Sequence, residues 1–276
     1  MIFNEMFTLQ NGVNMPKFAL GTWLIEDSIV SDTVQNALQI GYRHIDTAQA
    51  YENERGVGEA IRLSGIPREE IFITSKVVAE TKSFQEAEAS IDESLRKSGL
   101  DYLDLMLIHC PQPWAEYPDS PNRYLTENIQ VWKALEKAYQ SGKVRAIGVS
   151  NFLQSDIENL LSACKIKPMV NQIRVNVTHT PLDLIAYCQE QNIIVEAYSP
   201  IAHGDALNLS VLGSLAQKYG ITVPQLCIQY DLQLGLGVLP KTTHPEYMLS
   251  NAQLDFTISD EDMLMLKHLT LVEEIN

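Results

Sequence analysis

Four side chains capable of acid–base chemistry stand at or just beyond the ends of short apolar runs. Asp46 follows one such run, and Tyr51 comes five residues later. Lys76 and His109 stand near the ends of the next two runs of the same kind. No single spacing among them is a motif. Their shared position at the ends of strand-like segments is the signal that they form a site.

Together these residue types could act as a general acid with a group that stabilises a developing negative charge. A free tyrosine has a pKa near 10, and a nearby ammonium lowers it by stabilising the phenolate. A half-buried ammonium keeps its charge only beside a carboxylate. Asp46 could therefore hold Lys76, Lys76 could tune Tyr51, and His109 could donate a hydrogen bond to a substrate oxygen. A carbonyl reduction or an enolisation would suit this set.

A structural interpretation of the same residues is open at this point. An Asp and a Lys at strand ends often form a structural ion pair, Asp46 could cap the following helix, and a histidine after an apolar strand is often a core residue. Spacing does not choose between the two interpretations. No serine or cysteine nucleophile is evident, and metal ligands are too few to predict a metal site.

The elements that must position these residues follow a regular rhythm. Asn11-Gly12 predicts a hairpin over residues 7–18, since this dipeptide is a strong turn signal. Short runs rich in Ile, Val and Leu then recur, and they are typical of strands buried on both faces of a parallel sheet. They cover residues 18–23, 44–48, 71–77, 103–109, 144–150, 169–175, 193–200 and 237–242.

Amphipathic segments lie between these runs, for example over residues 28–42, 84–99, 126–142 and 155–164. Eight strands alternating with helices in 276 residues predict a single (β/α)8 TIM barrel over 1–276, preceded by the hairpin. A doubly wound open sheet is the competing fold, but no dinucleotide-binding glycine motif follows the first strand. In a barrel the carboxyl ends of the strands meet on one face, which would bring the four side chains together.

Composition excludes several classes of partner. Apolar residues make up 45% of the chain and charged residues 20%, as in ordinary globular proteins. The net charge of −15 argues against nucleic acid and against an anionic membrane surface, since both need clustered Lys and Arg. The four widely spaced cysteines suggest a reducing compartment. Because the sequence shows neither a signal peptide nor a membrane-spanning run, we expect a cytoplasmic protein.

Eight motifs then occur in one order along nearly the whole chain. They are ALGTW (19–23), HIDTAQAYENE (44–54), ITSK (73–76), LIHCPQP (107–113), GKVRAIGVSNF (142–152), VNQI (170–173), AYSPIA (197–202) and LPKTT (239–243). In this combination the sequence resembles the aldo-keto reductase family. It is similar to the short, prokaryotic-type branch that includes diketogluconate and methylglyoxal reductases.

The resemblance implies an NADPH-dependent barrel enzyme that reduces aldehydes and ketones. It implies a catalytic tetrad of Asp46, Tyr51, Lys76 and His109, with Tyr51 as the proton donor. Ser150, Asn151 and Gln172 match positions that hold the carboxamide of the nicotinamide, and Tyr198 matches the residue stacked beneath that ring. The other cofactor-binding positions that the resemblance implies are Gly21, Thr22, Trp23, Ser199, Pro200, Ile201, Lys241, Thr242, Thr243 and Asn251.

Departures from the family pattern also carry expectations. Tyr247 replaces the arginine that usually clamps the 2′-phosphate, so NADH is an alternative cofactor, although Lys241 keeps NADPH favoured. Trp23, Cys110 and Trp114 would shape the substrate side beside Tyr51 and His109, with Cys110 widening the pocket where the family often has a tryptophan. The chain closes with LTLVEEIN, without the long loop of vertebrate members, which predicts a more open pocket.

Two other functions stay in view. Some proteins of this family act as cofactor-binding regulatory subunits with little turnover, and the intact tetrad argues against that role. A barrel isomerase that uses Tyr51 and His109 without a cofactor is a weaker alternative. The expected partner is a small-molecule carbonyl substrate, and we expect a monomer because the barrel needs no partner to close. The sequence does not identify the substrate.

Overall fold

The computed structural model describes residues 1–269 and begins with the expected hairpin. Strands β1 (Met6–Thr8) and β2 (Asn14–Pro16) pair antiparallel, with Phe7 opposite Met15. Gly12, in the turn, has φ +83°, a left-handed conformation that glycine adopts without a steric penalty. Leu9 and Met15 pack on residues of the barrel interior such as Phe72 and Leu105, so the hairpin closes the amino-terminal end of the barrel.

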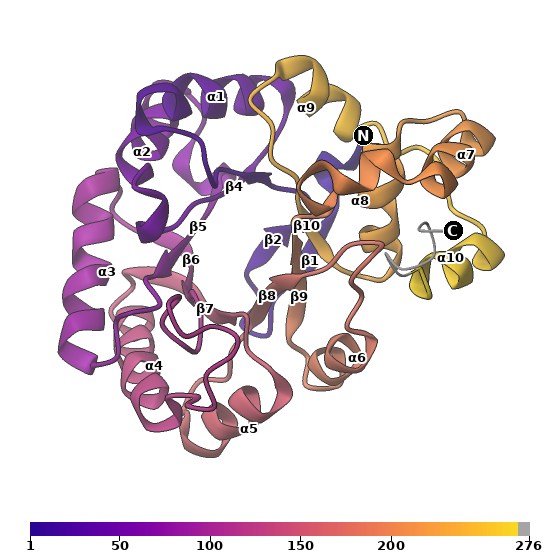
Figure 1. The fold of residues 1–276 in the computed structure, drawn as a ribbon. Helices are drawn as coiled ribbons and strands as arrows, with labels where there is room; N and C mark the ends of the chain where they lie inside the picture. The colour runs from indigo at the N-terminus through magenta and orange to yellow at the C-terminus, as the bar shows by residue number, and fades with distance from the viewer. Residues whose placement is uncertain (270–276) are drawn as a thin grey trace.

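Eight parallel strands form the barrel, in the order in which they occur along the chain. This confirms the predicted (β/α)8 fold (Figure 1). The strands are β3 (Leu20–Gly21), β4 (His44–Asp46), β5 (Phe72–Val77), β6 (Leu103–Ile108), β7 (Val144–Ser150), β8 (Val170–Arg174), β9 (Ile194–Tyr198) and β10 (Gly237–Leu239).

The first and last strands meet and complete the ring. Phe18 bridges to Val238 in parallel, and the amides of Ala19 and Gly21 donate to the carbonyls of Val238 and Pro240 at 3.0 and 3.1 Å. Gly21 suits this close approach, because a Cβ there would lie 3.3 Å from the carbonyl oxygen of Leu239, which is tighter than ordinary van der Waals contact. All the backbone groups that close the ring come from one chain.

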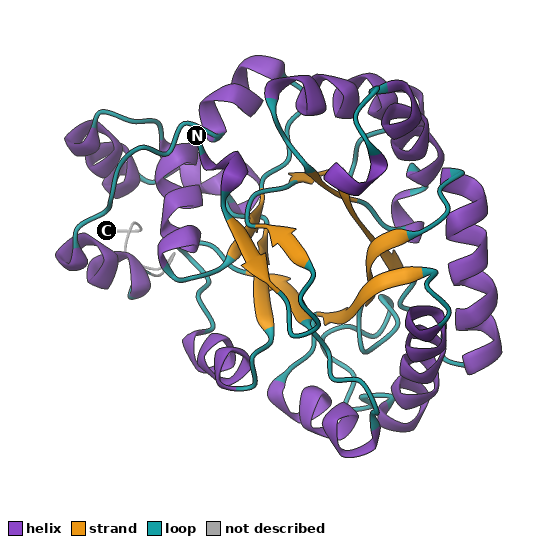
Figure 2. Ribbon diagram, turned by 180° about the vertical axis from the view of Figure 1, so that it is seen from behind, coloured by secondary structure: helices purple, strands orange, loops and turns teal. Residues whose placement is uncertain are grey.

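Helices surround the strands, as Figures 1 and 2 show. Successive strands are joined by α1 (Asp27–Ile40), α2 (Glu54–Leu63), α3 (Phe84–Ser98), α4 (Leu125–Gln140), α5 (Gln154–Ala163), α6 (Leu182–Glu190) and the pair α7 (Ser210–Tyr219) and α8 (Val223–Gln233). After β10 come α9 (Pro245–Asn251) and α10 (Asp260–Lys267). Residues of α7, α8 and α10 form a smaller apolar cluster beside the barrel.

The barrel interior changes from apolar to polar along its axis. Residues two apart on a strand point to the same side, so each strand supplies a row of inward-facing side chains. Near the hairpin these rows are apolar and include Phe72, Leu105 and Ala146. Toward the carboxyl ends the same rows continue as Lys76 and Ser150. The site therefore lies on a packed base.

Among the described residues, no helix is long and apolar enough to cross a bilayer. The expectation of a more open pocket rests on the segment 269–276, and residues 270–276 of it lie outside the described part of the chain.

Candidate active site

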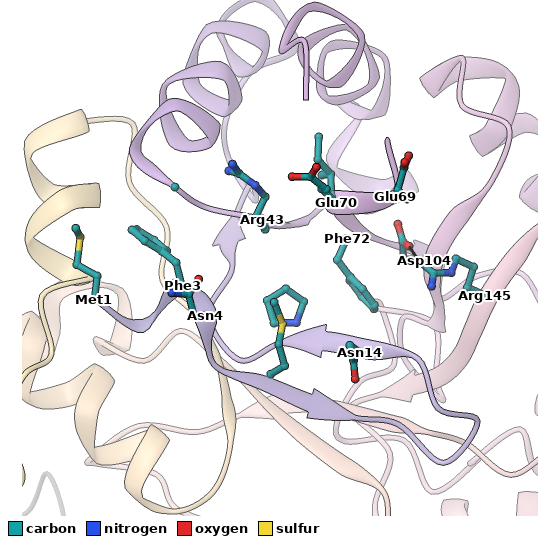
Figure 3. A pocket seen from close by; sticks show the side chains of 14 residues that line it. Met1, Phe3, Asn4, Asn14, Arg43, Glu69, Glu70, Phe72, Asp104 and Arg145 are labelled. Carbon is teal, nitrogen blue, oxygen red and sulfur yellow. Dashed lines mark hydrogen bonds and ion pairs between the residues drawn. The ribbon is translucent and has the colours of Figure 1, made fainter. Parts of the chain in front are cut away.

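Two cavities of similar size lie at opposite ends of the barrel. The cavity at the amino-terminal end, about 770 Å³, is bordered by the hairpin and by charged residues of both signs; Figure 3 shows Arg43, Glu69, Glu70, Asp104 and Arg145 around it. Its arginines are engaged within the protein: Arg145 pairs with Asp104 at 2.8 Å, and Arg43 donates to two backbone carbonyls. The cavity at the carboxyl end is about 890 Å³.

Most residues singled out from the sequence line the cavity at the carboxyl end, hereafter the active-site cavity. They are Gly21, Trp23, Asp46, Tyr51, His109, Trp114, Ser150, Asn151, Gln172, Tyr198, Ser199, Pro200, Ile201 and Lys241. The lining also contains residues that the motifs did not single out, namely Leu24, Ala50, Arg174, His203, Gly204 and Leu239. Ends of parallel strands thus converge on one cavity, as the barrel geometry predicts.

The four acid–base residues lie together at the base of this cavity. Lys76 Nζ donates to both oxygens of Asp46 at 2.7 and 2.8 Å, to the carbonyl of Thr47 at 2.8 Å, and to the Tyr51 hydroxyl at 3.3 Å. Lys76 is fully buried. The rings of Tyr51 and His109 meet edge to face with centroids 5.6 Å apart. Tyr51 reaches this position in a short 3-10 helix, η2 (Gln49–Tyr51), directly after β4.

The pKa values of this group are set by burial and by the ion pair. Burial alone would lower the pKa of Lys76, but Asp46 and Tyr51 outweigh it, so the pKa of Lys76 is raised and the ammonium stays charged. Burial raises the pKa of Tyr51, and Lys76 opposes that rise without reversing it. The expected lowering of the tyrosine pKa therefore does not hold here, because desolvation of the phenolate outweighs the attraction of Lys76.

His109 is neutral. Burial, and then the nearby Lys76 charge, hold the pKa of His109 well below its usual value of 6.5. Its Nδ1 is buried and has no hydrogen-bond partner among residues 1–269. A neutral imidazole carries one N–H, so His109 can donate a single hydrogen bond to a ligand without carrying a charge.

A second set of titratable residues lies one step deeper in the barrel. The Gln172 amide nitrogen donates to Asp46 Oδ2 at 2.8 Å and to Glu196 Oε2 at 3.2 Å. Burial and then Asp46 raise the pKa of the Glu196 carboxyl to about 8. Burial lowers the pKa of His44 to about 4, and its Nδ1 lies 3.8 Å from Glu196. Both groups are therefore neutral between these values, and they form no ion pair.

These deeper residues were not singled out from the sequence, although a signal existed. His44 lies two residues before Asp46, and Glu196 two residues before Tyr198, so each shares the inward-facing row of a predicted site residue. The Pro16 carbonyl, which can only accept, lies 3.2 Å from His44 Nδ1 and places the proton there. His44 Nε2 then accepts from the Thr74 hydroxyl at 2.9 Å.

The positions proposed for the nicotinamide carboxamide form one connected polar group. Asn151 Oδ1 accepts from the Tyr198 hydroxyl at 2.7 Å, and its Nδ2 donates to the His109 carbonyl at 2.9 Å and to Ser150 Oγ at 3.1 Å. Asn151 and Ser199 follow strand ends with φ of +62° and +54°. Left-handed conformations of non-glycine residues are uncommon and often occur at functional sites.

Four of the proposed cofactor positions lie outside the cavity lining. Thr22 is fully buried and donates to the carbonyl of Asp46 at 2.9 Å, so it holds the end of β4 in place. Thr242, Thr243 and Asn251 lie beyond Lys241, toward and within α9. Their proposed contacts with the adenosine end of a cofactor remain predictions. Tyr247, in α9, is 57% exposed and packs against His244 with ring centroids 5.2 Å apart.

Of the residues proposed for the substrate side, the two tryptophans line the cavity and Cys110 does not, so their contacts with a substrate remain predictions. Trp114 packs edge to face on His109, with centroids 5.1 Å apart, and on Tyr117 at 5.7 Å, so it belongs to both the cavity and its loop. Trp23 also lines the cavity, where its ring meets that of His203 edge to face. Cys110 is fully buried and absent from the lining. The inward row of β6 contains Leu105 and Leu107 and leads to His109, and Cys110 is the next residue, packed beneath the surface of the cavity wall.

Within the described residues, no cluster of three or more His, Cys, Asp and Glu side chains is placed to hold a metal ion. The polar residues do fit a nicotinamide cofactor. Ser150, Asn151 and Gln172 present amide and hydroxyl groups to the cavity beside the Tyr198 ring, and Lys241 supplies a cation for phosphate.

Comparison with known proteins gives consistent matches. A model of the aldo/keto reductase family matches residues 17–270. A glyoxal reductase of Bacillus subtilis (strain 168) is 43% identical over 92% of this chain and 89% of its own length. A 9,11-endoperoxide prostaglandin H2 reductase of Trypanosoma cruzi (strain CL Brener) is 38% identical over 95% of this chain and 90% of its own.

Solved structures agree with these relatives. An aldo-keto reductase from a Medee basin deep-sea metagenome library superposes with a TM-score of 0.89 at 36% identity, covering 96% of this chain and 94% of that one. A Bombyx mori aldo-keto reductase in complex with NADP superposes with a TM-score of 0.84 at 34% identity, covering 95% and 92%.

The buried carboxyl of Glu196 predicts a pH-dependent effect on stability. Its pKa is raised from 4.5 to about 8 in the folded protein, so between these values the carboxyl is protonated when folded and ionised when unfolded. Its contribution to the free energy of unfolding therefore falls as pH rises from 4.5 to 8. Glu196→Gln removes that loss. As pH rises from 5 to 8, the free energy of unfolding of the variant should therefore increase relative to wild type by roughly 2–5 kcal/mol.

Urea unfolding of both proteins at several pH values measures this difference. Glu190→Gln, at an exposed glutamate that ends α6, is the matched control and should follow the wild-type pH dependence. A Glu196→Gln protein whose stability stays parallel to wild type across this range would show that the Glu196 carboxyl is not neutral in the fold.

Proposed function

Because the chain belongs to the aldo/keto reductase family and is an NAD(P)H-dependent oxidoreductase, we propose that it reduces an aldehyde or ketone to an alcohol with NADPH, using Tyr51 as the proton donor. The observation that carries the proposal is the ammonium of Lys76, which lies 3.3 Å from the Tyr51 hydroxyl while holding both oxygens of Asp46.

The chain's own residues account for the proton and for the orientation of the substrate. A bound nicotinamide cofactor supplies the hydride that is added to the carbonyl carbon. Tyr51 transfers its hydroxyl proton to the carbonyl oxygen, so that the C=O bond becomes an alcohol, and Lys76 stabilises the phenolate that is left. The single N–H of neutral His109 donates to the same oxygen and fixes its direction.

The raised pKa of Tyr51 is compatible with this role. A phenol that stays protonated across neutral pH is available as an acid in every molecule, whereas one with a strongly lowered pKa would already have lost its proton. Lys76 contributes mainly after the transfer, because its attraction for the phenolate exceeds its attraction for the neutral phenol. The pair therefore favours the product side of the proton transfer.

The residues that would hold the cofactor divide into two groups. Ser150, Asn151 and Gln172 would hold the carboxamide, with Tyr198 beneath the ring. Lys241 would hold the 2′-phosphate, and this contact favours NADPH over NADH. The neutral Tyr247 provides no second charge for that phosphate, which leaves NADH as a weaker alternative.

The wider setting is also a proposal. We infer one barrel domain over residues 1–276 that acts as a monomer in the cytoplasm. The support for the monomer is that β3 and β10 complete the ring within one chain. The support for the location is the sequence alone.

Tyr51→Phe tests the proton donor. Removing the hydroxyl while keeping the ring should lower kcat by about 10²–10⁴, the usual contribution of a general acid. The Kd for NADPH, measured by the quenching of NADPH fluorescence, should stay within a few-fold of the wild-type value. Tyr187→Phe, in α6 and away from the cavity, is the matched control and should retain wild-type turnover.

Near-wild-type turnover by the Tyr51→Phe protein would refute the assignment of the proton donor. Wild-type protein that binds NADPH but consumes it with no member of a broad carbonyl panel would instead favour the regulatory role.

Lys241→Met tests the cofactor preference. A charge-assisted hydrogen bond is worth about 1.5–3 kcal/mol, so the variant should lower kcat/KM for NADPH by about 10- to 100-fold and change that for NADH much less. Lys133→Met, at an exposed position of α4, is the matched control. Equal losses with both cofactors would show that Lys241 does not distinguish the 2′-phosphate.

A further inference from the structure

Arg174 is a cation in the active-site cavity to which the proposed mechanism gives no role. It is the last residue of β8 and lines the cavity. Gln172, two residues earlier, points into the barrel and donates to Asp46, so Arg174 lies on the same inward row, one step nearer the mouth. It stands in register with Tyr198 on the neighbouring strand. The fold therefore presents this guanidinium at the level of the proposed nicotinamide site.

Arg174 differs from every other arginine of the chain. Each of the other seven donates a hydrogen bond to a carboxylate, a side-chain amide or a backbone carbonyl: Arg43, Arg55, Arg62, Arg68, Arg96, Arg123 and Arg145. The guanidinium of Arg174 makes no hydrogen bond or ion pair with any described residue, although its backbone takes part in the β8–β9 ladder. In a chain of net charge −15, carboxylates are abundant, yet within residues 1–269 none forms an ion pair with the Arg174 guanidinium.

The charges lining the cavity leave Arg174 available to a ligand. Asp46 is the only carboxylate among the described lining residues, and Lys76 already neutralises it. The cations Arg174 and Lys241 remain. Lys241 lies beyond β10, beside the loop of Ser199–Ile201, and is assigned above to the cofactor phosphate. The lining formed by residues 1–269 is therefore locally positive even though the protein as a whole is acidic, and this local field favours an anionic ligand.

The charge of Arg174 also acts on two tyrosines, Tyr198 in the cavity lining and Tyr117 in the loop that carries Trp114. Burial raises the pKa of Tyr117, and the charge of Arg174 is among the groups that oppose this rise, so the guanidinium lies within electrostatic reach of that ring. Tyr117 packs on Trp114, which in turn packs on His109. Arg174 is therefore near the loop whose Trp114 packs on His109, the proposed hydrogen-bond donor. Arg174 belongs to β8, whereas Lys241 follows β10.

We propose that Arg174 binds a carboxylate on the substrate, so that the preferred substrates are aldehydes or ketones carrying a carboxylate some distance from the carbonyl. This inference rests on the proposed carbonyl reduction. A guanidinium offers two parallel N–H donors to a carboxylate, which fixes orientation as well as affinity. With one end held by Arg174, the carbonyl at the other end lies between Tyr51 and His109.

A matched pair of substrates tests the proposal. 4-Carboxybenzaldehyde and 4-methylbenzaldehyde have similar shapes and differ in the charge at one end. With NADPH, wild-type protein should show kcat/KM at least tenfold higher for the carboxylated aldehyde. Arg174→Gln should reduce this ratio by about 10- to 100-fold, mainly through KM, because a hydrogen bond to a charged group is lost. Arg174→Lys should retain part of the preference, and Arg96→Gln, on the exposed face of α3, should retain all of it.

Three results would overturn the proposal. The first is equal kcat/KM of wild-type protein for the two aldehydes. The second is a loss of kcat/KM in Arg174→Gln by the same factor for both aldehydes. The third is a raised KM for NADPH in Arg174→Gln with an unchanged KM for the carboxylated aldehyde, which would place a cofactor phosphate on Arg174.

A binding measurement separates this proposal from the proposed function. Tryptophan fluorescence measures the binding of 4-carboxybenzyl alcohol to the NADP⁺-loaded protein. The alcohol should bind the wild-type protein, and its Kd for Arg174→Gln should be at least tenfold higher. If neither aldehyde is reduced but this binding difference is found, the carbonyl reduction fails and the carboxylate site stands. Equal binding to both proteins would refute the carboxylate site whatever the turnover.

Discussion

The buried ion pair of Lys76 and Asp46 is the interaction on which the rest of the site depends. A fully buried ammonium costs several kcal/mol in desolvation unless a carboxylate and further acceptors surround it. Lys76 Nζ donates to both oxygens of Asp46 and to the carbonyl of Thr47 at 2.7–2.8 Å. It also donates to the Tyr51 hydroxyl, at 3.3 Å. The geometry follows from two adjacent parallel strands, β4 and β5, whose register sets Asp46 beside Thr74 and just below Lys76.

Around this pair the barrel arranges its inward-facing residues in layers two residues apart. The deeper layer is polar but neutral, with Glu196 protonated and His44 unprotonated at neutral pH. Gln172 links that layer to Asp46. A second carboxylate charge there would compete with Asp46 for Lys76, so the neutrality of Glu196 preserves the pairing. The upper layer, with Tyr198 and Arg174, lines the active-site cavity.

Sequence patterns predicted the fold and much of the grouping of the site, because both depend on local periodicity. These local patterns are the Asn11-Gly12 turn, the eight apolar runs and the positions of Asp46, Lys76 and His109 at strand ends. The features that the patterns could not predict depend on burial in three dimensions. The desolvation that raises the pKa of Tyr51, the burial of Cys110 outside the cavity lining and the lack of a partner for the Arg174 side chain within residues 1–269 are properties of the folded surroundings, which one sequence does not show.

A double-mutant cycle between Lys76 and Tyr51 tests the central claim most directly. It compares kcat/KM for one aldehyde in wild type, Lys76→Met, Tyr51→Phe and the double variant. Any general effect of leaving Asp46 unpaired is present with either residue at position 51 and cancels in the cycle. If Lys76 acts through the Tyr51 hydroxyl, Lys76→Met should cost about 10²-fold or more in the wild-type background and little when Tyr51 is already Phe. Equal costs in both backgrounds would contradict the account.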